Sequence, residues 1–237
     1  TNIEGLDVER VYGDVMEKDS IRAALEGCDT IYHTAGFVSF RKSDYSKMED
    51  INVKGTINAL SAALESGVRR AVYTSSVAAV GPDPDRGIAN EQTEFTLEEE
   101  GIQYLNTKYH AEKEAFRICE KGLPLVVVNP SVVIGPGDVY LSSTGFILWF
   151  CKRKFPGYME GTMNLVDVED VADAHLLAAE KGRVGERYIL GNRNVTLREL
   201  FQLLEDVTGV AGPRLKIPYF MADRKSTRLN SSHMSES

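Results

Sequence analysis

The chain has 237 residues, of which 43% are hydrophobic and 26% charged, and its formal net charge at pH 7 is −8. This length supports one sizeable hydrophobic core, or a core with a small second lobe. The negative charge argues against a nucleic-acid partner, because binding to phosphates needs clustered Lys and Arg. Apolar runs stay well below the roughly 20 residues of a membrane-spanning helix, so we expect no membrane partner.

Cysteine and histidine usage points to the reducing interior of a cell. Cys28, Cys119 and Cys151 are widely separated and form no CxxC pair, which is typical of reduced thiols rather than of a disulfide framework. Because a signal-peptide pattern is also missing, we expect a cytoplasmic protein. The four histidines lie at no metal-ligand spacing, so we expect no metal site.

Both ends of the sequence differ in character from the rest. Thr1 stands where a start methionine is usual, and the chain opens just before a strand pattern. From about Arg224 the composition changes to Ser, Arg and Asn, without any apolar period, and resembles translated sequencing-adapter read-through. We therefore assign residues 1–223 to the fold and treat 224–237 as a non-native or disordered tail. We expect a protein truncated at both ends.

Strand and helix patterns alternate along the chain. Apolar residues at helical spacing predict the helices, and Gly27, Gly67 and Gly209 are placed to end three of them. Asp19 or Ser20 is expected to cap the first helix. The predicted elements are, in chain order, a strand at 8–12, a helix from 19 or 20 to 27, a strand at 30–33, a helix at about 51–66, a strand at 68–74, a helix at about 102–120, strands at 125–129 and 187–190, and a helix from 196 to 209.

This order predicts the fold class. The continuous apolar run at 125–129 is typical of a parallel strand covered on both faces. Thr196 and Glu199 have the spacing of a capping box at a helix start. Alternating strands and helices favour a doubly wound, parallel-sheet α/β fold. Ligands bind such sheets at the carboxyl ends of the strands, where small and polar residues gather in this chain.

Tyr104 and Lys108 are the strongest chemical signal. Residues four apart on a helix lie on the same face, and an ammonium near a phenol is expected to lower its pKa. Tyr104 would then serve as a general acid and base, with Ser76 hydrogen-bonding the same substrate oxygen. A second pair, Tyr109 and Lys113, has the same spacing. Five residues turn the helix face by roughly 140°, so both pairs cannot serve one site, and we favour the first.

The motifs around this pair resemble those of the extended short-chain dehydrogenase/reductases, the NAD-dependent epimerase/dehydratase family. Within that family the chain is most similar to dihydroflavonol-reductase-like members and to hopanoid-associated sugar epimerases. The resemblance covers nearly all of residues 3–220, in order. Beside Tyr104-xxx-Lys108-xx-Ala111-Glu112 it rests on YGDV (12–15), YHTAG (32–36), NVKGT (52–56), VYTSSVAAVG (72–81), NPSVVIGPG (129–137) and NLVDVEDVADAH (164–175).

The resemblance implies a Rossmann fold that binds NAD or NADP, a small-molecule substrate, and Ser76, Tyr104 and Lys108 as the catalytic triad. A homodimer is compatible with it. Asp14 as a plain turn residue, and Asn52 as a helix cap or a bridge to the sheet, remain open. The cofactor-binding residues that it implies are Asp14, Val15, Thr34, Ala35, Gly36, Asn52, Ser75, Tyr104, Lys108, Asn129, Pro130 and Val132.

The chain departs from the family pattern at its start. The glycine-rich turn is absent, together with the first strand, its helix and most of the second strand, so NAD and NADP cannot be told apart. The substrate lobe, at about 138–165 and 192–223, is incomplete. We expect the fragment to fold poorly, to bind cofactor weakly and to be inactive by itself.

Two reactions share the implied machinery. One is the net transfer of a hydride to or from the carbon of a secondary alcohol or ketone. The other is transient oxidation that epimerises a nucleotide sugar. An alternative from another class is a non-catalytic NAD(P)-binding regulatory protein. The presence of Ser76, Tyr104 and Lys108 together favours an enzyme.

Overall fold

The computed structural model describes residues 2–83 and 87–218, so the tail expected at 224–237 lies outside the described residues. The chain divides into two compact units. The first comprises Thr1–Val133 and Val166–Gly191, and the second comprises Ile134–Leu165 and Asn192–Ser237. The residues predicted to carry the chemistry all belong to the first unit.

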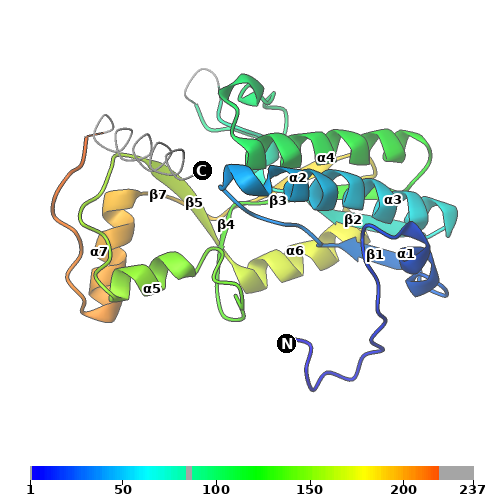
Figure 1. Ribbon diagram of the computed structural model, residues 1–237, viewed down its shortest axis with the longest axis horizontal. Coiled ribbons are helices and arrows are strands. Elements are labelled where there is room, and N and C mark those ends of the chain that lie inside the picture. The colour runs from blue at the N-terminus through cyan, green and yellow to red at the C-terminus, as the bar shows by residue number, and fades with distance from the viewer. Residues whose placement is uncertain (1, 84–86, 219–237) are drawn as a thin grey trace, which may run out of the picture. The chain divides into compact units, whose positions relative to one another are not determined.

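A four-stranded parallel sheet forms the centre of the first unit, as the sequence predicted (Figure 1). Its strands follow the order β1-β2-β3-β6, and all of them run in the same direction. The carboxyl ends of all four strands therefore meet at one edge, where ligands bind in such sheets. The bounds are β1 (Thr30–His33), β2 (Arg70–Thr74), β3 (Leu125–Pro130) and β6 (Arg187–Leu190).

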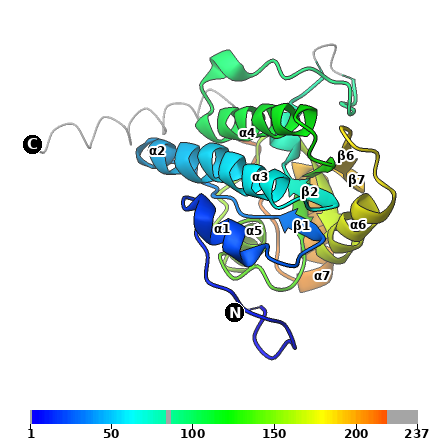
Figure 2. The same ribbon diagram turned by 90° about the vertical axis from the view of Figure 1, so that its right-hand side faces the viewer.

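Helices cover both faces of this sheet, and Figure 2 shows the two layers nearly end-on. One layer contains α3 and α4, which pack together with Tyr73 and Val127 in a common apolar core. On the other face, Val126 and Val128 pack against Ala178 of α6. Because β3 is buried on both sides, its sequence is a continuous apolar run. The helices of this unit are α1 (Lys18–Ala24), α2 (Tyr45–Met48), α3 (Gly55–Glu65), α4 (Gln103–Glu120) and α6 (Val168–Lys181).

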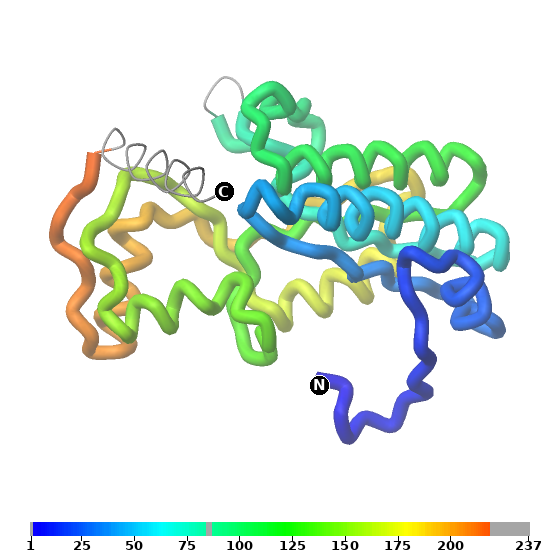
Figure 3. Tube along the Cα trace, in the orientation of Figure 1, coloured from blue at the N-terminus to red at the C-terminus, as the bar shows by residue number. Residues whose placement is uncertain are grey.

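The predicted strand at 8–12 is wrong. These residues are irregular and exposed, and the dark blue end of the trace in Figure 3 runs away from the sheet. A strand needs a neighbour for its backbone donors and acceptors. Residues 8–12 are paired with none of the described strands, and among these strands β1 is hydrogen-bonded only to β2.

The start of α1 also differs from the prediction. Neither Asp19 nor Ser20 caps it, because the helix begins one residue earlier and its N-cap position is Glu17. The Ser20 hydroxyl instead contacts the carbonyl oxygens of Asp14 and Glu17. The helix predicted at about 51–66 is formed by a π-helical segment, Glu49–Lys54, that continues into α3.

The second unit has a separate sheet and a separate core. The sheet contains β4 (Val132–Ile134), β5 (Thr162–Asp167) and β7 (Arg193–Thr196) in the order β4-β5-β7, with β5 and β7 antiparallel. Its helices are α5 (Gly145–Cys151) and α7 (Leu197–Thr208). The predicted capping box of Thr196 and Glu199 begins α7, and Gly209 ends it with φ 69°. Aromatic rings of both helices pack with Phe155 to form the core.

Candidate active site

Helix α4 presents one polar stripe to the sheet. Lys108 and Glu112 are buried on this face, between the buried Thr107 and Ala111. The second Tyr–Lys pair lies elsewhere on the helix, as predicted. Tyr109 stacks on Phe95 with ring centroids 4.4 Å apart, and the Lys113 ammonium lies 5.0 Å from the centre of the Tyr109 ring. The stripe that faces the strand ends therefore belongs to the first pair.

Ser76 and Tyr104 lie side by side. Ser76 follows β2 with an extended backbone and caps a short 3-10 helix, Val77–Ala79, its hydroxyl accepting the Ala78 N–H at 3.1 Å. The same side chain lies near enough to the Tyr104 phenol to affect its pKa. Burial raises the pKa of Tyr104, and the interaction with Ser76 lowers it in part. The exposed ring of Phe40 meets Tyr104 edge-on at 5.8 Å, on its open side.

Lys108 is almost completely buried, with an exposed fraction of 6%. Its ammonium donates to the carbonyl oxygen of Thr74 at 3.2 Å and lies 5.3 Å from the centre of the Tyr73 ring. Burial lowers the pKa of Lys108 to about 8, although the Glu112 carboxylate acts in the opposite direction. A buried ammonium is stable here because a carbonyl dipole and an aromatic face replace part of its water.

One electrostatic expectation is wrong for this structure. The sequence predicted that Lys108 lowers the pKa of the Tyr104 phenol, but burial raises it. The Lys108 ammonium is directed to the main chain of β2. Tyr104 is consequently a neutral phenol at physiological pH, poised to donate a proton.

His33, at the end of β1, is a buried histidine that sequence reasoning missed. Its ring stacks on Tyr73 at 5.5 Å, and its Nε2 lies 3.0 Å from the Thr56 hydroxyl. Burial, and secondarily the charge of Lys108, lowers the pKa of His33 to about 4. The histidine is therefore neutral at physiological pH and stacks as a neutral ring on Tyr73, the residue whose ring also contacts Lys108.

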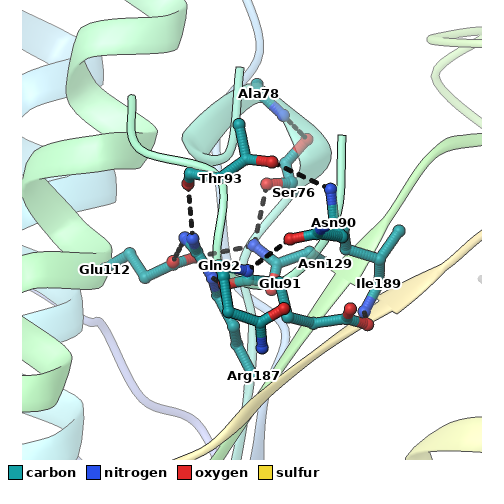
Figure 4. Close-up of polar contacts among 10 residues, drawn as sticks. All are labelled: Ser76, Ala78, Asn90, Glu91, Gln92, Thr93, Glu112, Asn129, Arg187 and Ile189. Carbon is teal, nitrogen blue, oxygen red and sulfur yellow. Dashed lines mark hydrogen bonds and ion pairs between the residues drawn. The ribbon is translucent and has the colours of Figure 1, made fainter. Parts of the chain in front are cut away.

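A buried polar network lies behind Ser76 (Figure 4). Asn129, at the end of β3, donates from Nδ2 to the Ser76 carbonyl at 2.9 Å and to Glu112 Oε2 at 2.6 Å. Arg187 of β6 donates to the other oxygen of Glu112 at 2.9 Å. Glu112 lies four residues after Lys108 and eight after Tyr104. That spacing is the sequence signal that could have identified Glu112. No comparable sequence signal pointed to Arg187.

The residues predicted to bind the cofactor near β1 fall into two groups. Thr34, Ala35 and Gly36 are exposed in the loop that leaves the strand. Asn52 is buried instead: its Oδ1 accepts the Phe37 N–H at 2.7 Å, and its Nδ2 donates to the Phe37 carbonyl at 2.9 Å and to the Thr107 hydroxyl at 3.3 Å. All the hydrogen-bonding groups of its amide are thus used within the protein, joining the β1 loop to α4.

Asp14 and Val15 precede α1. The Asp14 carboxylate accepts the Met16 N–H at 2.8 Å and so closes a turn, while the side chain is exposed. The Val15 carbonyl accepts Asn58 Nδ2 at 2.9 Å. Val15 also packs so tightly on the start of α3 that a Cβ on Gly55 would lie 2.8 Å from its Cγ2. This close approach explains the glycine of the NVKGT motif.

The remaining predicted residues lie along the ends of β2 and β3. Ser75 is buried, and its N–H donates to the Val128 carbonyl at 2.8 Å, which extends the sheet pairing by one residue. Pro130 is the buried last residue of β3, and Val132 begins β4 half-buried. Ser75 follows the end of β2, and Pro130 and Val132 follow Asn129 at the end of β3, so all three lie at the ligand-binding edge of the sheet.

Comparison with known proteins assigns the chain to a family. The model of the NAD dependent epimerase/dehydratase family matches residues 2–191. The chain belongs to this family. It is an α/β protein of the Rossmann type, as predicted, and the family description includes the nicotinamide cofactor that the sequence motifs implied.

Individual members of the family are similar over most of the chain. Sterol demethylase protein B of Methylococcus capsulatus is 41% identical over 217 residues, covering 91% of this chain and 66% of that protein. Cinnamoyl-CoA reductase 1 of Petunia hybrida is 32% identical, covering 90% of this chain and 68% of that protein. The crystal structure of gox2253 is 40% identical with a TM-score of 0.85, covering 91% and 66%. The chain spans about two thirds of the length of these relatives.

Residues 2–83 and 87–218 contain no helix long and apolar enough to cross a membrane. Over the same ranges, no group of three or more His, Cys, Asp and Glu side chains is placed to hold a metal ion.

Proposed function

We propose that the complete protein is an NAD(P)-dependent oxidoreductase that acts on the carbon of a secondary alcohol or ketone. The proposal rests on one observation: a half-buried phenol, Tyr104, lies beside Ser76 at the carboxyl edge of a parallel sheet, with residue Lys108 one helical turn further along α4. A general acid, a hydrogen-bond donor for the substrate oxygen and a fixed positive charge are then within one site.

Two features of the site suit a nicotinamide cofactor. Thr34–Gly36 are small and exposed, so they leave backbone groups open at the carboxyl end of β1. The Lys108 ammonium has three N–H donors, and the Thr74 carbonyl takes one of them. We assign cofactor binding to these residues together with Asp14, Val15, Ser75, Asn129, Pro130 and Val132, and we assign Asn52 to holding the loop that contains Gly36. The nicotinamide, when bound, supplies or takes up the hydride.

The roles of Tyr104 and Ser76 follow from their shared position beside the substrate oxygen. In the reducing direction Tyr104 donates its phenolic proton to the carbonyl oxygen, while the Ser76 hydroxyl donates a hydrogen bond to that oxygen. In the oxidising direction the phenolate accepts the proton of the substrate hydroxyl. The raised pKa of Tyr104 suits the reducing direction at neutral pH, because the phenol is already protonated.

Replacement of Tyr104 by Phe tests this function. The complete protein is assayed for NADH and NADPH consumption with a keto-sterol and a dihydroflavonol, and for conversion of UDP-glucose without net cofactor consumption. A sterol is tested because sterol demethylase protein B is a relative, and the dihydroflavonol and the nucleotide sugar are tested because the sequence motifs resemble those of reductases and epimerases of this family. We expect Tyr104→Phe to lower kcat by about 100-fold to 10,000-fold and to leave cofactor affinity, measured by NADPH fluorescence, nearly unchanged. Full activity of Tyr104→Phe, or no binding of either cofactor by the unmodified protein, would refute the proposal.

A further inference from the structure

Glu112 is a buried carboxylate whose two oxygens are both used. Its exposed fraction is 3%, and such a group is costly to bury unless hydrogen bonds replace its water. Arg187 Nη1 donates to Oε1 at 2.9 Å, and Asn129 Nδ2 donates to Oε2 at 2.6 Å. The carboxylate therefore stands between two donors that come from two different strands.

Asn129 transmits the position of Glu112 to Ser76. Its Nδ2 donates both to Glu112 Oε2 and to the Ser76 carbonyl, the latter at 2.9 Å. Both partners are acceptors, so the nitrogen of the amide, and not its oxygen, must face them. The Ser76 hydroxyl is fixed in turn by the Ala78 N–H at 3.1 Å. Holding the main chain of Ser76 thus also holds its hydroxyl, as the contacts of Ser76 with Asn129 and Ala78 in Figure 4 show.

Arg187 anchors the far side of Glu112. Besides its ion pair, its guanidinium donates to the carbonyl oxygens of Glu91 and Thr93, both at 2.8 Å. The Glu91 side chain returns to β6 by accepting the Ile189 N–H at 3.0 Å. With its donors fixed on three acceptors, the guanidinium holds Glu112 Oε1 in a defined place.

We propose that Glu112 is a positioning residue for the reaction: it holds Asn129, and Asn129 holds the main chain of Ser76 so that the Ser76 hydroxyl stays in hydrogen-bond reach of Tyr104. This inference rests on the proposed function of Ser76 and Tyr104. Glu112 lies behind Asn129 and has no contact with the reacting oxygen. It acts through the chain of hydrogen bonds that ends at Ser76.

Glu112→Gln separates this role from simple packing. Glutamine keeps the size of the side chain but offers one oxygen where two donors need acceptors, so its NH2 must face either Asn129 or Arg187. We expect kcat of the complete protein to fall by about 10-fold to 100-fold, because a small misplacement of a reacting group is costly, while KM changes by less than about twofold. Glu114→Gln is the matched control, because Glu114 lies on the same helix, is only partly buried and is paired with the exposed Arg117 rather than with Asn129 or Arg187. It should leave kcat unchanged.

A double-mutant cycle shows whether Glu112 acts through Ser76. Ser76→Ala removes the hydroxyl that Glu112 is proposed to position, so adding Glu112→Gln should lower kcat little further. If the two fold-losses multiply, Glu112 acts by another route and the inference fails. Should Glu112→Gln not fold, Asn129→Ala replaces it in the same cycle. That variant leaves the pair of Glu112 and Arg187 in place while removing the link to Ser76, and the same two outcomes apply.

Amide hydrogen exchange gives a readout without cofactor or substrate. The Ala78 N–H is bonded to the Ser76 hydroxyl, so its exchange should accelerate in Glu112→Gln relative to Glu114→Gln. Equal exchange in the two variants would overturn the inference. A different result would contradict the proposed function, namely that Tyr104→Phe and Ser76→Ala both stay active. If those two variants lose activity while Glu112→Gln behaves like its control, only the positioning role of Glu112 is contradicted.

Discussion

The Tyr104 phenol lies beside Ser76, which affects its pKa, whereas Lys108 donates to the main chain of Thr74. Helical spacing places Tyr104 and Lys108 on one face, but it does not decide where a long, flexible side chain ends. The Lys108 ammonium reaches past the phenol to a carbonyl group, because a buried cation needs an acceptor more than it needs a neutral neighbour. The protonation of Tyr104 therefore depends chiefly on burial and on Ser76.

Ser76→Ala should consequently change the pH dependence of the reaction. Removing the hydroxyl removes the interaction that lowers the pKa of Tyr104, so this pKa rises further above its ordinary value. In the oxidising direction the rate rises with pH as the phenolate forms, and we expect this rise to move to higher pH, with kcat about 100-fold lower. The measurement is kcat against pH, with Ser76→Thr as the variant that keeps a hydroxyl. A rise at the same pH in Ser76→Ala would contradict the assignment.

The candidate site could be predicted from sequence only where its residues are close in sequence. Tyr104 and Lys108 share a helix face, and the carboxyl ends of predicted strands place Ser76 and Asn129 nearby. Glu112 was also within reach, because it continues the same face of α4. Its partner Arg187 lies 75 residues further along the chain, and no local pattern connects the two. Such long-range partners follow from the packing of β3 against β6, which sequence spacing does not contain.

Elements were predictable where burial on both sides imposes a strong pattern. The four strands of the parallel sheet and the helices α3, α4 and α7 lie close to their predicted positions. The strands β4, β5 and β7 were missed, since they are short and largely half-buried or exposed. The seven residues of α5 are apolar on nearly every side, so their period distinguishes helix from strand poorly. The segment 8–12 shows that a strand-like pattern is not sufficient to form a strand, because this segment pairs with no strand in the described structure.

At the junction of Val15 and α3, Gly55→Ala should be destabilising. In most exposed helix positions this change stabilises by up to about 1 kcal/mol. Here the added Cβ would lie 2.8 Å from Val15 Cγ2, so we expect a loss of about 1–3 kcal/mol in the free energy of unfolding, measured by urea titration. Val15→Ala in the same chain removes the clash and should recover most of the loss. Stabilisation by Gly55→Ala in the presence of Val15 would show that the contact is looser than the structure has it.

Two buried bases link the stability of the first unit to pH. The pKa of Lys108 is about 8 in the folded protein, against an ordinary 10.5. Between these values the unfolded chain holds a proton that the folded chain has released, so stability rises as pH increases through this window. The pKa of His33 is lowered from 6.5 to about 4, and the same reasoning applies at lower pH. Both groups oppose folding when charged, because both are buried and both lie against Tyr73.

Acid should therefore unfold the protein partly through His33. As pH falls from 6.5 to about 4, the unfolded chain binds a proton at this histidine before the folded chain does, and the free energy of unfolding decreases by up to about 3 kcal/mol. His33→Phe keeps a ring that can stack on Tyr73 and removes the titrating group, so its urea midpoint should depend less on pH over this range. Thr56→Val removes the hydrogen-bond partner of His33 but not its titration. It should lower the midpoint at every pH and keep the slope of the parent. If His33→Phe loses stability with acid as steeply as the parent does, the proton responsible binds elsewhere, and the buried histidine is not what limits the fold at low pH.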